Sequence, residues 1–222
     1  MADGSGELPR SGYAKSGVTR QAILTAALSE FGLKGFGGAT TRAIADAAGV
    51  ALPAIAYHFG NKEGLYRACA QDIVAAYQAS AISLMSGAAH LFQSGQPSPQ
   101  QCRTLLSDTL KMVLRLFLDS KTGEAQADFA MRELRDRGPA FDILHDRLWQ
   151  PGVEVVAQLI CAIRNTRTVS QSDRADALML ISSLLAFGTG RDVSLRILGV
   201  EPGQSHTFDI LDTAIERAVA GL

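Results

Sequence analysis

Polar and basic side chains suited to holding an anion gather between residues 40 and 62. Thr40, Thr41 and Arg42 stand where an apolar helical pattern begins, and Lys62 stands at the start of a later one. The free N–H groups and the positive dipole end at the start of a helix attract anions, and a hydroxyl or basic side chain there adds to the attraction. The chemistry that these residues favour is phosphate binding.

Catalytic or metal-binding sets are much less evident. No Ser/His/Asp, Cys/His or paired-carboxylate arrangement recurs at motif spacing, so we expect neither an enzyme nor a cofactor. Asp142, His145 and Asp146 are spaced i, i+3 and i+4, share one helix face and could offer metal ligands. Because only one histidine and no cysteine is nearby, we expect no metal site. The glycines of residues 32–38 precede no Lys-Ser/Thr pair, so they predict a turn rather than a nucleotide-phosphate loop.

Two short helical patterns joined by a glycine-containing turn position the anion-binding residues. The apolar face of the first pattern consists of Ile44, Ala45 and Ala48. Gly49 follows, where a left-handed residue commonly ends a helix, and Pro53 falls in the first turn of the next helix, residues 54–59. A longer helix starts near Lys62. Two helices joined in this way form a helix-turn-helix, whose second helix is shaped to lie in a DNA major groove.

This segment resembles the DNA-binding region of TetR-family transcriptional regulators over residues 18–66. The matching features are Ile44-Ala45, Ala48-Gly49-Val50, Tyr57-His58-Phe59, Lys62-Glu63 and Leu65-Tyr66. The form LPAIAYHFGNKEGLY and the later stretch MRELRDRGPAFDILHDRLWQPGV resemble the CecR-like subgroup. The resemblance implies an all-α protein with a three-helix DNA-binding domain joined to a larger helical domain for ligand binding and dimerisation.

The resemblance also implies which side chains meet DNA. The groove-facing set is Leu52, Pro53, Ala54 and Ala56. The phosphate- and backbone-contacting set is Thr40, Thr41, Arg42, Tyr57, His58 and Lys62. The groove-facing side chains are apolar, which suits thymine methyl groups and DNA shape rather than bidentate hydrogen bonds.

Two departures from the family pattern affect this helix. Ala51 stands at the cap of the second helix, where the family usually has Ser or Thr, and losing that oxygen costs ~1 kcal/mol of helix-end stability. Ala54 and Ala56 stand where the family commonly has Thr and Tyr. The operator sequence therefore stays open, whereas DNA binding itself does not depend on these two positions.

Composition is consistent with an ordered DNA-binding protein. Hydrophobic residues make up 47% of the 222 residues and charged residues 19%, which excludes a disordered chain. The net charge of -1 does not by itself indicate a nucleic-acid binder. However, residues 1–62 hold six Lys or Arg against four Asp or Glu, a net charge of +2, and the rest of the chain has a net charge of -3. This asymmetry has the sign that DNA contact through the N-terminal part requires.

Cysteine usage and hydropathy indicate the compartment. Cys69, Cys102 and Cys161 are far apart in the chain, which is typical of a reducing cytoplasm rather than a disulfide framework. The N-terminus lacks the apolar segment of a signal peptide, and the longest apolar run, residues 177–188, is too short to span a bilayer. We expect a soluble cytoplasmic protein with no membrane partner.

Apolar periodicity divides the chain into three parts. Residues 1–17 are expected to be a disordered arm, either a plain tail or a basic arm that reaches DNA through Arg10 and Lys15. Residues 18–62 form the helix-turn-helix domain, and residues 63–222 form the helical ligand-binding and dimerisation domain. The expected helices are 19–31, 62–91, 99–119, 124–135, 140–148, 151–164, 172–198 and 207–219, besides the two of the helix-turn-helix.

The C-terminal part is expected to hold an effector pocket and a dimer interface. The candidate ligand-binding residues are Phe117, Phe129, Arg132, Phe141, His145 and Trp149, with ordinary core packing as the alternative for each aromatic ring. Arg132, Glu133, Arg135 and His145 could read the charge of a ligand, with solvated ion pairs as the alternative expected for most of them. The helices 172–198 and 207–219 would form a four-helix interface between two protomers.

The function that follows is a homodimeric, ligand-responsive transcriptional regulator, most simply a repressor. It would bind a pseudo-palindromic double-stranded operator and be released when a small-molecule effector binds. Two alternatives remain: a small-molecule-binding helical protein whose helix-turn-helix is not used for DNA recognition, and a helical protein-interaction module.

Overall fold

The computed structural model describes residues 11–93, 97–118, 121–201 and 203–222. Over these ranges the secondary structure is helical without a strand, which confirms the all-α class. The elements are α1 (Ser11–Gly38), α2 (Thr41–Ala48), α3 (Pro53–Phe59), α4 (Lys62–Gln93), α5 (Pro99–Leu118), α6 (Lys121–Asp136), α7 (Phe141–Leu144), the π-helix η1 (His145–Trp149), α8 (Gln150–Ile163), α9 (Gln171–Leu185), α10 (Arg191–Leu198) and α11 (Ser205–Ala220).

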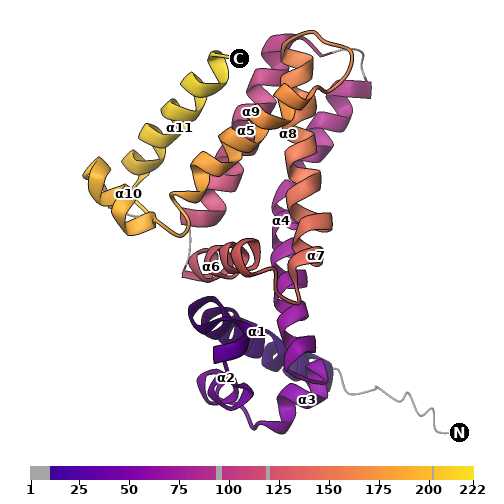
Figure 1. Ribbon diagram of the computed structural model, residues 1–222, viewed down its shortest axis with the longest axis vertical. Coiled ribbons are helices and arrows are strands. Elements are labelled where there is room, and N and C mark those ends of the chain that lie inside the picture. The colour runs from indigo at the N-terminus through magenta and orange to yellow at the C-terminus, as the bar shows by residue number, and fades with distance from the viewer. Residues whose placement is uncertain (1–10, 94–96, 119–120, 202) are drawn as a thin grey trace, which may run out of the picture.

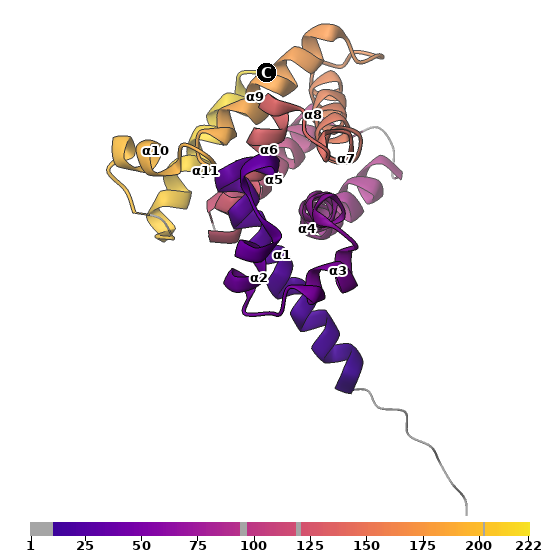
Figure 2. The same cartoon turned by 60° about the horizontal axis from the view of Figure 1, so that its bottom comes forward.

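The helices form two groups joined by α4. In Figure 1 the helices α1, α2 and α3 make the lower end, and α5, α8 and α9 make a bundle at the upper end. The long helix α4 packs on α1 and α3 at one end and on α5 at the other. Helix α6 lies across the middle and packs on α1, while α10 and α11 lie on the outer side of the bundle (Figures 1 and 2).

Each group has its own hydrophobic core. The first core joins the buried faces of α1, α2, α3 and the start of α4 with single residues of α6 and α7. Its largest fully buried side chains include Phe31, Tyr66 and Phe129. The second core joins α5, α8, α9, α10 and α11 around Leu106, Leu110 and Leu114. The molecule therefore has two packed bodies rather than one.

Two boundaries in the N-terminal half differ from the sequence predictions. Helix α1 begins at Ser11, so residues 11–17 are helical rather than a disordered arm, and Thr19 is not the cap. Arg10 and the side chain of Lys15 lie outside the described residues. The expected turn at residues 32–38 is part of α1, which is kinked at Gly35 (φ 70°, ψ 178°). The positive φ at this position explains the glycine.

Three boundaries in the C-terminal half also differ. Helix α6 begins at Lys121, where a break was expected. The regions 140–148 and 151–164 run on as α7, η1 and α8 without an intervening loop. The expected helix 172–198 is divided into α9 and α10. Gly188 sits at that division, where a Cβ would lie 3.1 Å from the Cβ of Ala127 on α6. The longest apolar run, residues 177–188, ends at this division, and Thr189, Arg191 and Asp192 follow it.

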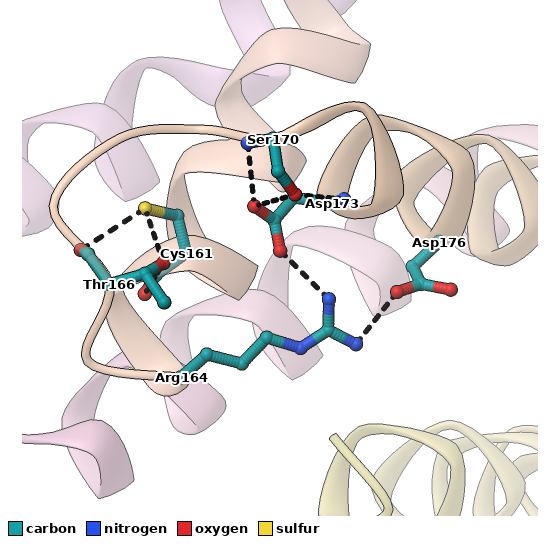
Figure 3. A network of polar contacts seen from close by, with 6 residues as sticks. All are labelled: Cys161, Arg164, Thr166, Ser170, Asp173 and Asp176. Carbon is teal, nitrogen blue, oxygen red and sulfur yellow. Dashed lines mark hydrogen bonds and ion pairs between the residues drawn. The ribbon is translucent and has the colours of Figure 1, made fainter.

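A polar network fixes the corner between α8 and α9 (Figure 3). The Arg164 guanidinium donates to Asp173 at 2.8 Å and to Asp176 at 2.7 Å. The Ser170 hydroxyl accepts from the Asp173 N–H, and the Asp173 carboxylate accepts from the Ser170 N–H, which is a reciprocal capping box. The Thr166 hydroxyl donates to the Cys161 carbonyl in the same corner. These bonds define where α9 starts and therefore which of its faces is exposed.

Candidate nucleic-acid interface

Helix α2 is closed at both ends as its sequence predicts. The Thr40 Oγ1 accepts from the Ala43 N–H at 3.1 Å, which satisfies one free donor of the first turn. Gly49 has a left-handed backbone (φ 65°), and the Val50 N–H donates back to the Ala45 carbonyl at 3.0 Å. The turn to α3 is thereby fixed by backbone geometry.

Helix α3 presents an exposed face at the end of the molecule. It begins at Pro53, and its cap residue is Leu52 rather than the expected Ala51, with no side-chain cap bond in either case. Ile55 is buried and anchors the helix to the first core. The exposed residues around it are Leu52, Pro53, Ala56 and Tyr57. Tyr57 is 82% exposed, so its ring is not a core residue.

Two members of the predicted contact sets lie differently. Ala54 is half-buried and packs against the first core, which leaves little of it for a groove. His58 is half-buried beside Tyr57, with ring centroids 5.0 Å apart in an edge-to-face arrangement. The structure therefore brings three of the four predicted groove-facing residues onto one exposed face.

The junction between α3 and α4 depends on two glycines. Gly60 has a positive φ of 78°, which favours glycine. A Cβ at Gly64 would collide with the carbonyl oxygen of Phe59, so the first turn of α4 approaches the end of α3 too closely for any side chain there. The Asn61 Oδ1 accepts from the Gly64 N–H at 2.8 Å and caps α4. This cap was not predicted, although an asparagine before a helix is a known signal.

The basic groups of this end are partly held by aromatic rings. The Lys62 ammonium lies 4.8 Å from the Phe36 ring centroid, and the Arg20 guanidinium lies 5.2 Å from the Phe59 ring centroid. Arg42 is exposed at the start of α2, next to Thr41. Sequence reasoning missed Arg20, because only the fold places the middle of α1 beside the end of α3.

The predicted ligand-binding residues are distributed over several packing environments. Phe141 is stacked with His145, with centroids 5.8 Å apart, and meets Trp149 edge-on at 5.7 Å. Phe129 is fully buried in the first core, and Phe117 belongs to the second. Arg132 donates to two backbone carbonyls of α1. Of the six residues, three form one cluster at α7 and η1.

Glu133 is the polar residue whose position sequence reasoning most misplaced. It is 1% exposed rather than in a solvated ion pair. Its Oε1 accepts from the Tyr66 hydroxyl at 2.5 Å, and its Oε2 accepts from the Ala140 N–H at 3.1 Å. Arg135, by contrast, is exposed and pairs with Asp136 as expected. Burial raises the pKa of the Glu133 carboxyl, although its two hydrogen bonds oppose the rise.

Metal clusters, disulfides and membrane-spanning helices are absent from the described ranges. The His145 Nδ1 lies 2.7 Å from the Asp146 Oδ1. Within the described ranges, no group of three or more His, Cys, Asp or Glu residues is placed to hold a metal ion. The three cysteines are unpaired and buried. None of the described helices has the length and apolar character needed to cross a membrane.

Two family models match this chain in tandem. Residues 23–69 match that of bacterial regulatory proteins of the tetR family. Residues 102–222, just over half of the chain, match the C-terminal domain of the HTH-type transcriptional dual regulator CecR. The first match contains α2 and α3 together with the turn between them.

Two curated relatives agree with these matches. CecR of Shigella flexneri is 30% identical over 186 residues, which are 82% of this chain and 80% of that protein. RaaS of Mycobacterium tuberculosis, an HTH-type transcriptional regulatory protein, is 53% identical over 53 residues, 24% of each chain.

Solved structures share the fold. A TetR-like regulator from Rhodococcus sp. RHA1 has a TM-score of 0.64 at 19% identity, with 96% of this chain and 97% of that chain covered. AibR, solved with isovaleryl coenzyme A and operator DNA, has a TM-score of 0.56 at 14% identity, with 76% and 85% covered. The chain therefore belongs to the TetR family of transcriptional regulators and has a C-terminal domain of the CecR type.

Proposed function

We propose that this protein is a homodimeric repressor that binds a pseudo-palindromic operator and leaves it when a small molecule binds. The observation that supports this most directly is the exposed face of α3, formed by Leu52, Pro53, Ala56 and Tyr57. In a helix-turn-helix this face enters the major groove. Its apolar side chains would read thymine methyl groups and groove shape, and they leave base-edge hydrogen bonds to few partners.

Phosphate contacts would come from the groups around α3. Thr41 and Arg42 lie at the start of α2, where the helix end attracts an anion. Tyr57 is largely exposed with His58 beside it, and the cations of Arg20 and Lys62 lie over Phe59 and Phe36 at the same end of the molecule. The Thr40 side-chain oxygen accepts from the Ala43 N–H, so Thr40 would support this site by capping α2 rather than by offering a backbone N–H to the phosphate. These contacts set the register on DNA and have no base preference.

Dimerisation would use α9 and α10. Large apolar side chains are exposed on both helices: Leu178, Met179, Val193 and Ile197. The apolar residues of α11, in contrast, pack on the second core, so this helix has less to offer a partner than the sequence suggested. A patch of this kind on one chain is typical of a surface that a second copy covers. Two copies are needed because one short helix contacts too little of an operator.

The effector would act from the C-terminal part. The ring cluster of Phe141, His145 and Trp149 is our candidate contact surface, because its rings contact one another and are at least partly exposed, whereas Phe117 and Phe129 are buried in the two cores. That AibR was solved with both an acyl coenzyme A and operator DNA supports an effector-controlled mode of action. A regulator of this kind works in the cytoplasm and catalyses no reaction.

Operator selection from random duplex DNA with the purified protein tests this proposal. We expect an enriched inverted repeat with half-sites about 10 base pairs apart, or a multiple of that spacing. Binding to it should weaken steeply with salt. Failure to enrich any sequence, with a sample shown by mass spectrometry to have no bound small molecule, would contradict the DNA-binding proposal.

Single substitutions test the phosphate contacts. Arg42→Ala should weaken binding by a similar factor on every sequence and reduce the salt slope by about 1. Arg217→Ala, an exposed arginine of α11 far from this end, is the matched control and should leave both quantities unchanged. An unchanged salt slope for Arg42→Ala would remove this residue from the interface.

A further inference from the structure

The first hydrophobic core does not end with the DNA-binding domain. Phe129 of α6, and Ala140 and Leu144 at α7, are buried in it together with residues of α1 and α4. The Tyr66 ring is surrounded by Phe31 and Phe36 of α1 and by Phe129, with centroids 4.7, 5.1 and 4.6 Å away. A division of the chain after residue 62 would cut through this packing.

Adjacent residues of α6 hold the two parts together by hydrogen bonds. Glu133 accepts from the Tyr66 hydroxyl of α4 and from the Ala140 N–H before α7. Arg132 donates from Nε to the Gly32 carbonyl at 3.1 Å and from Nη2 to the Leu33 carbonyl at 2.9 Å. We call these two residues, with their four partners, the α6 clasp. A buried acceptor without its donors would be strongly unfavourable, so the clasp bonds are retained in any arrangement of low energy.

Glycines bring the two helices close enough for the clasp. A Cβ at Gly35, which has a positive φ, would lie 3.1 Å from the Arg132 side chain. A Cβ at Gly32 would lie 3.3 Å from the Ala125 carbonyl oxygen and from the Asp128 Cβ. Helices α1 and α6 therefore pack backbone against backbone at this point, and they have little freedom to slide.

The first core reaches through the π-helical turn η1, because Leu148 and Trp149 in that turn still pack against it, and the second core begins on α8. Leu144, before the turn, is buried in the first core, whereas Val156, Ala157 and Ile160, beyond it on α8, are buried in the second. A π-turn inside a helix has poorer hydrogen-bond geometry than the α-helix around it and often marks a functional site. One continuous helical run thus passes from one packed body to the other after η1.

We propose that α6 from Phe129 onward and α7 form one rigid unit with the DNA-binding helices, which ends at η1. Arg132 and Glu133 are positioning residues for α3: they touch no DNA, but they set the direction of the DNA-binding helices relative to the dimer surface on α9. The rigid unit stands on packing alone, and its consequence for an operator rests on the proposed function.

Hydrogen exchange on the full-length protein tests the rigid unit without DNA. Tyr66→Phe keeps the ring and removes one clasp bond, so exchange should become about tenfold faster in α1, α6 and α7 and stay unchanged in α8 and α9. Tyr77→Phe is the matched control on the same helix, because the Tyr77 hydroxyl has no hydrogen-bond partner among the described residues although its ring packs on the same core. Arg132→Gln provides a second, independent opening of the clasp.

The pattern of exchange decides the outcome. Faster exchange confined to the start of α4, with α6 and α7 unaffected, would overturn the proposal, and so would equal acceleration in α8 and α9. A uniform acceleration by Tyr77→Phe as large as that by Tyr66→Phe would show that loss of a hydroxyl on α4, rather than loss of the clasp bond, is responsible, and would overturn it too.

The dependence of DNA binding on half-site separation distinguishes a positioning residue from a purely structural one. On operators whose half-site separation is varied by one base pair at a time, Tyr66→Phe and Arg132→Gln should flatten the wild-type preference, because α3 is positioned less rigidly. An unchanged preference, in variants that show faster exchange, would overturn the positioning role. If no operator is enriched at all, the proposed function fails, and the exchange pattern still decides whether the rigid unit exists.

Discussion

Two buried carboxylates, Glu133 at the clasp and Asp173 at the α8–α9 corner, have pKa values shifted in opposite directions, although burial raises both. Their residues are 1% and 3% exposed. Burial raises the pKa of Glu133, and the neutral donors Tyr66 and Ala140 only partly oppose it. The pKa of Asp173 is lowered, first by the Ser170 N–H and hydroxyl, which outweigh burial, and then by Arg164.

The difference shows that partners, rather than burial, decide which form of a buried acid is stable. Asp173 has a cation, a hydroxyl and a helix-cap N–H, all from within ten residues of the chain. Glu133 has a phenol 67 residues away and one backbone N–H, and no cation pairs with it within the described ranges. The corner is therefore a local structure in which the carboxylate has a cation partner, whereas the Glu133 carboxyl of the clasp has uncharged, mainly long-range partners.

Glu133→Ala should have the largest effect. It leaves the Tyr66 hydroxyl and the Ala140 N–H buried without an acceptor and opens a cavity, so we expect the free energy of unfolding to fall by roughly 3 kcal/mol. Urea denaturation measures it. Glu154→Ala, which breaks an exposed pair with Arg174, is the control and should change stability by less than about 0.5 kcal/mol. A loss below about 1 kcal/mol for Glu133→Ala would mean that the clasp contributes little.

Gly138→Ala should come next. A Cβ at this position would collide with the Glu133 carboxylate, which must then move away from Tyr66. We expect a loss of roughly 2 kcal/mol, as for an overpacked core. Gly152→Ala, whose Cβ would meet nothing nearby, should be neutral or slightly stabilising. Combining Gly138→Ala with Tyr66→Phe should give less than the sum of the two losses, because both act on one hydrogen bond.

Asp173→Ala should cost less than either clasp variant. The capping box and the partner of Arg164 are lost, but Arg164 keeps Asp176 and is partly exposed. A lost helix cap is worth about 1 kcal/mol. Thermal unfolding should show this loss, and α9 amides should exchange faster while those of α1 and α6 do not. A loss as large as that of Glu133→Ala would mean that the corner is not merely a local structure.

The helix-turn-helix and the clasp differ in how far the sequence predicted them. Gly49, Pro53 and the apolar face of Ile44 act within a few residues, so the two helices and the turn between them could be predicted directly, whereas the DNA contacts stay a prediction. The burial of Glu133 could not, because it depends on Tyr66 and on a close approach between α1 and α6 that no local pattern records. The sequence around Glu133 is rich in charge and predicted a solvated face.

Helix ends were mispredicted for related reasons. The apolar run 177–188 ends at the division between α9 and α10, where Thr189, Arg191 and Asp192 follow, and the single expected helix passed over this polar break. The close approach of Gly188 to Ala127 lies at the same place. The start of α1 was placed at Thr19 because the glycines and serines before it favour disorder, yet the helix continues to Ser11. The effector cluster stays a prediction, since the aromatic rings named from composition were distributed by the fold over two cores.

The smallest expected effect is a difference in pH dependence. Glu133 has a folded pKa above its ordinary value of 4.5, so its contribution is most favourable below that pH and is lost as pH rises through the folded pKa. Asp173 has a folded pKa below its ordinary value of 3.8, so its contribution is present above that value and is lost as pH falls through the folded pKa. The two acids should therefore give stability differences of opposite slope.

Urea denaturation of Glu133→Gln and Asp173→Asn across a pH series measures both slopes. From about pH 5 upward, wild type should lose stability relative to Glu133→Gln, whereas its advantage over Asp173→Asn should stay constant and shrink only at strongly acidic pH. Parallel slopes would mean that the two carboxylates share one kind of environment. The contrast between Glu133, whose partners are uncharged, and Asp173, which has a cation partner, would then be wrong, even if each substitution destabilises the protein by the expected amount.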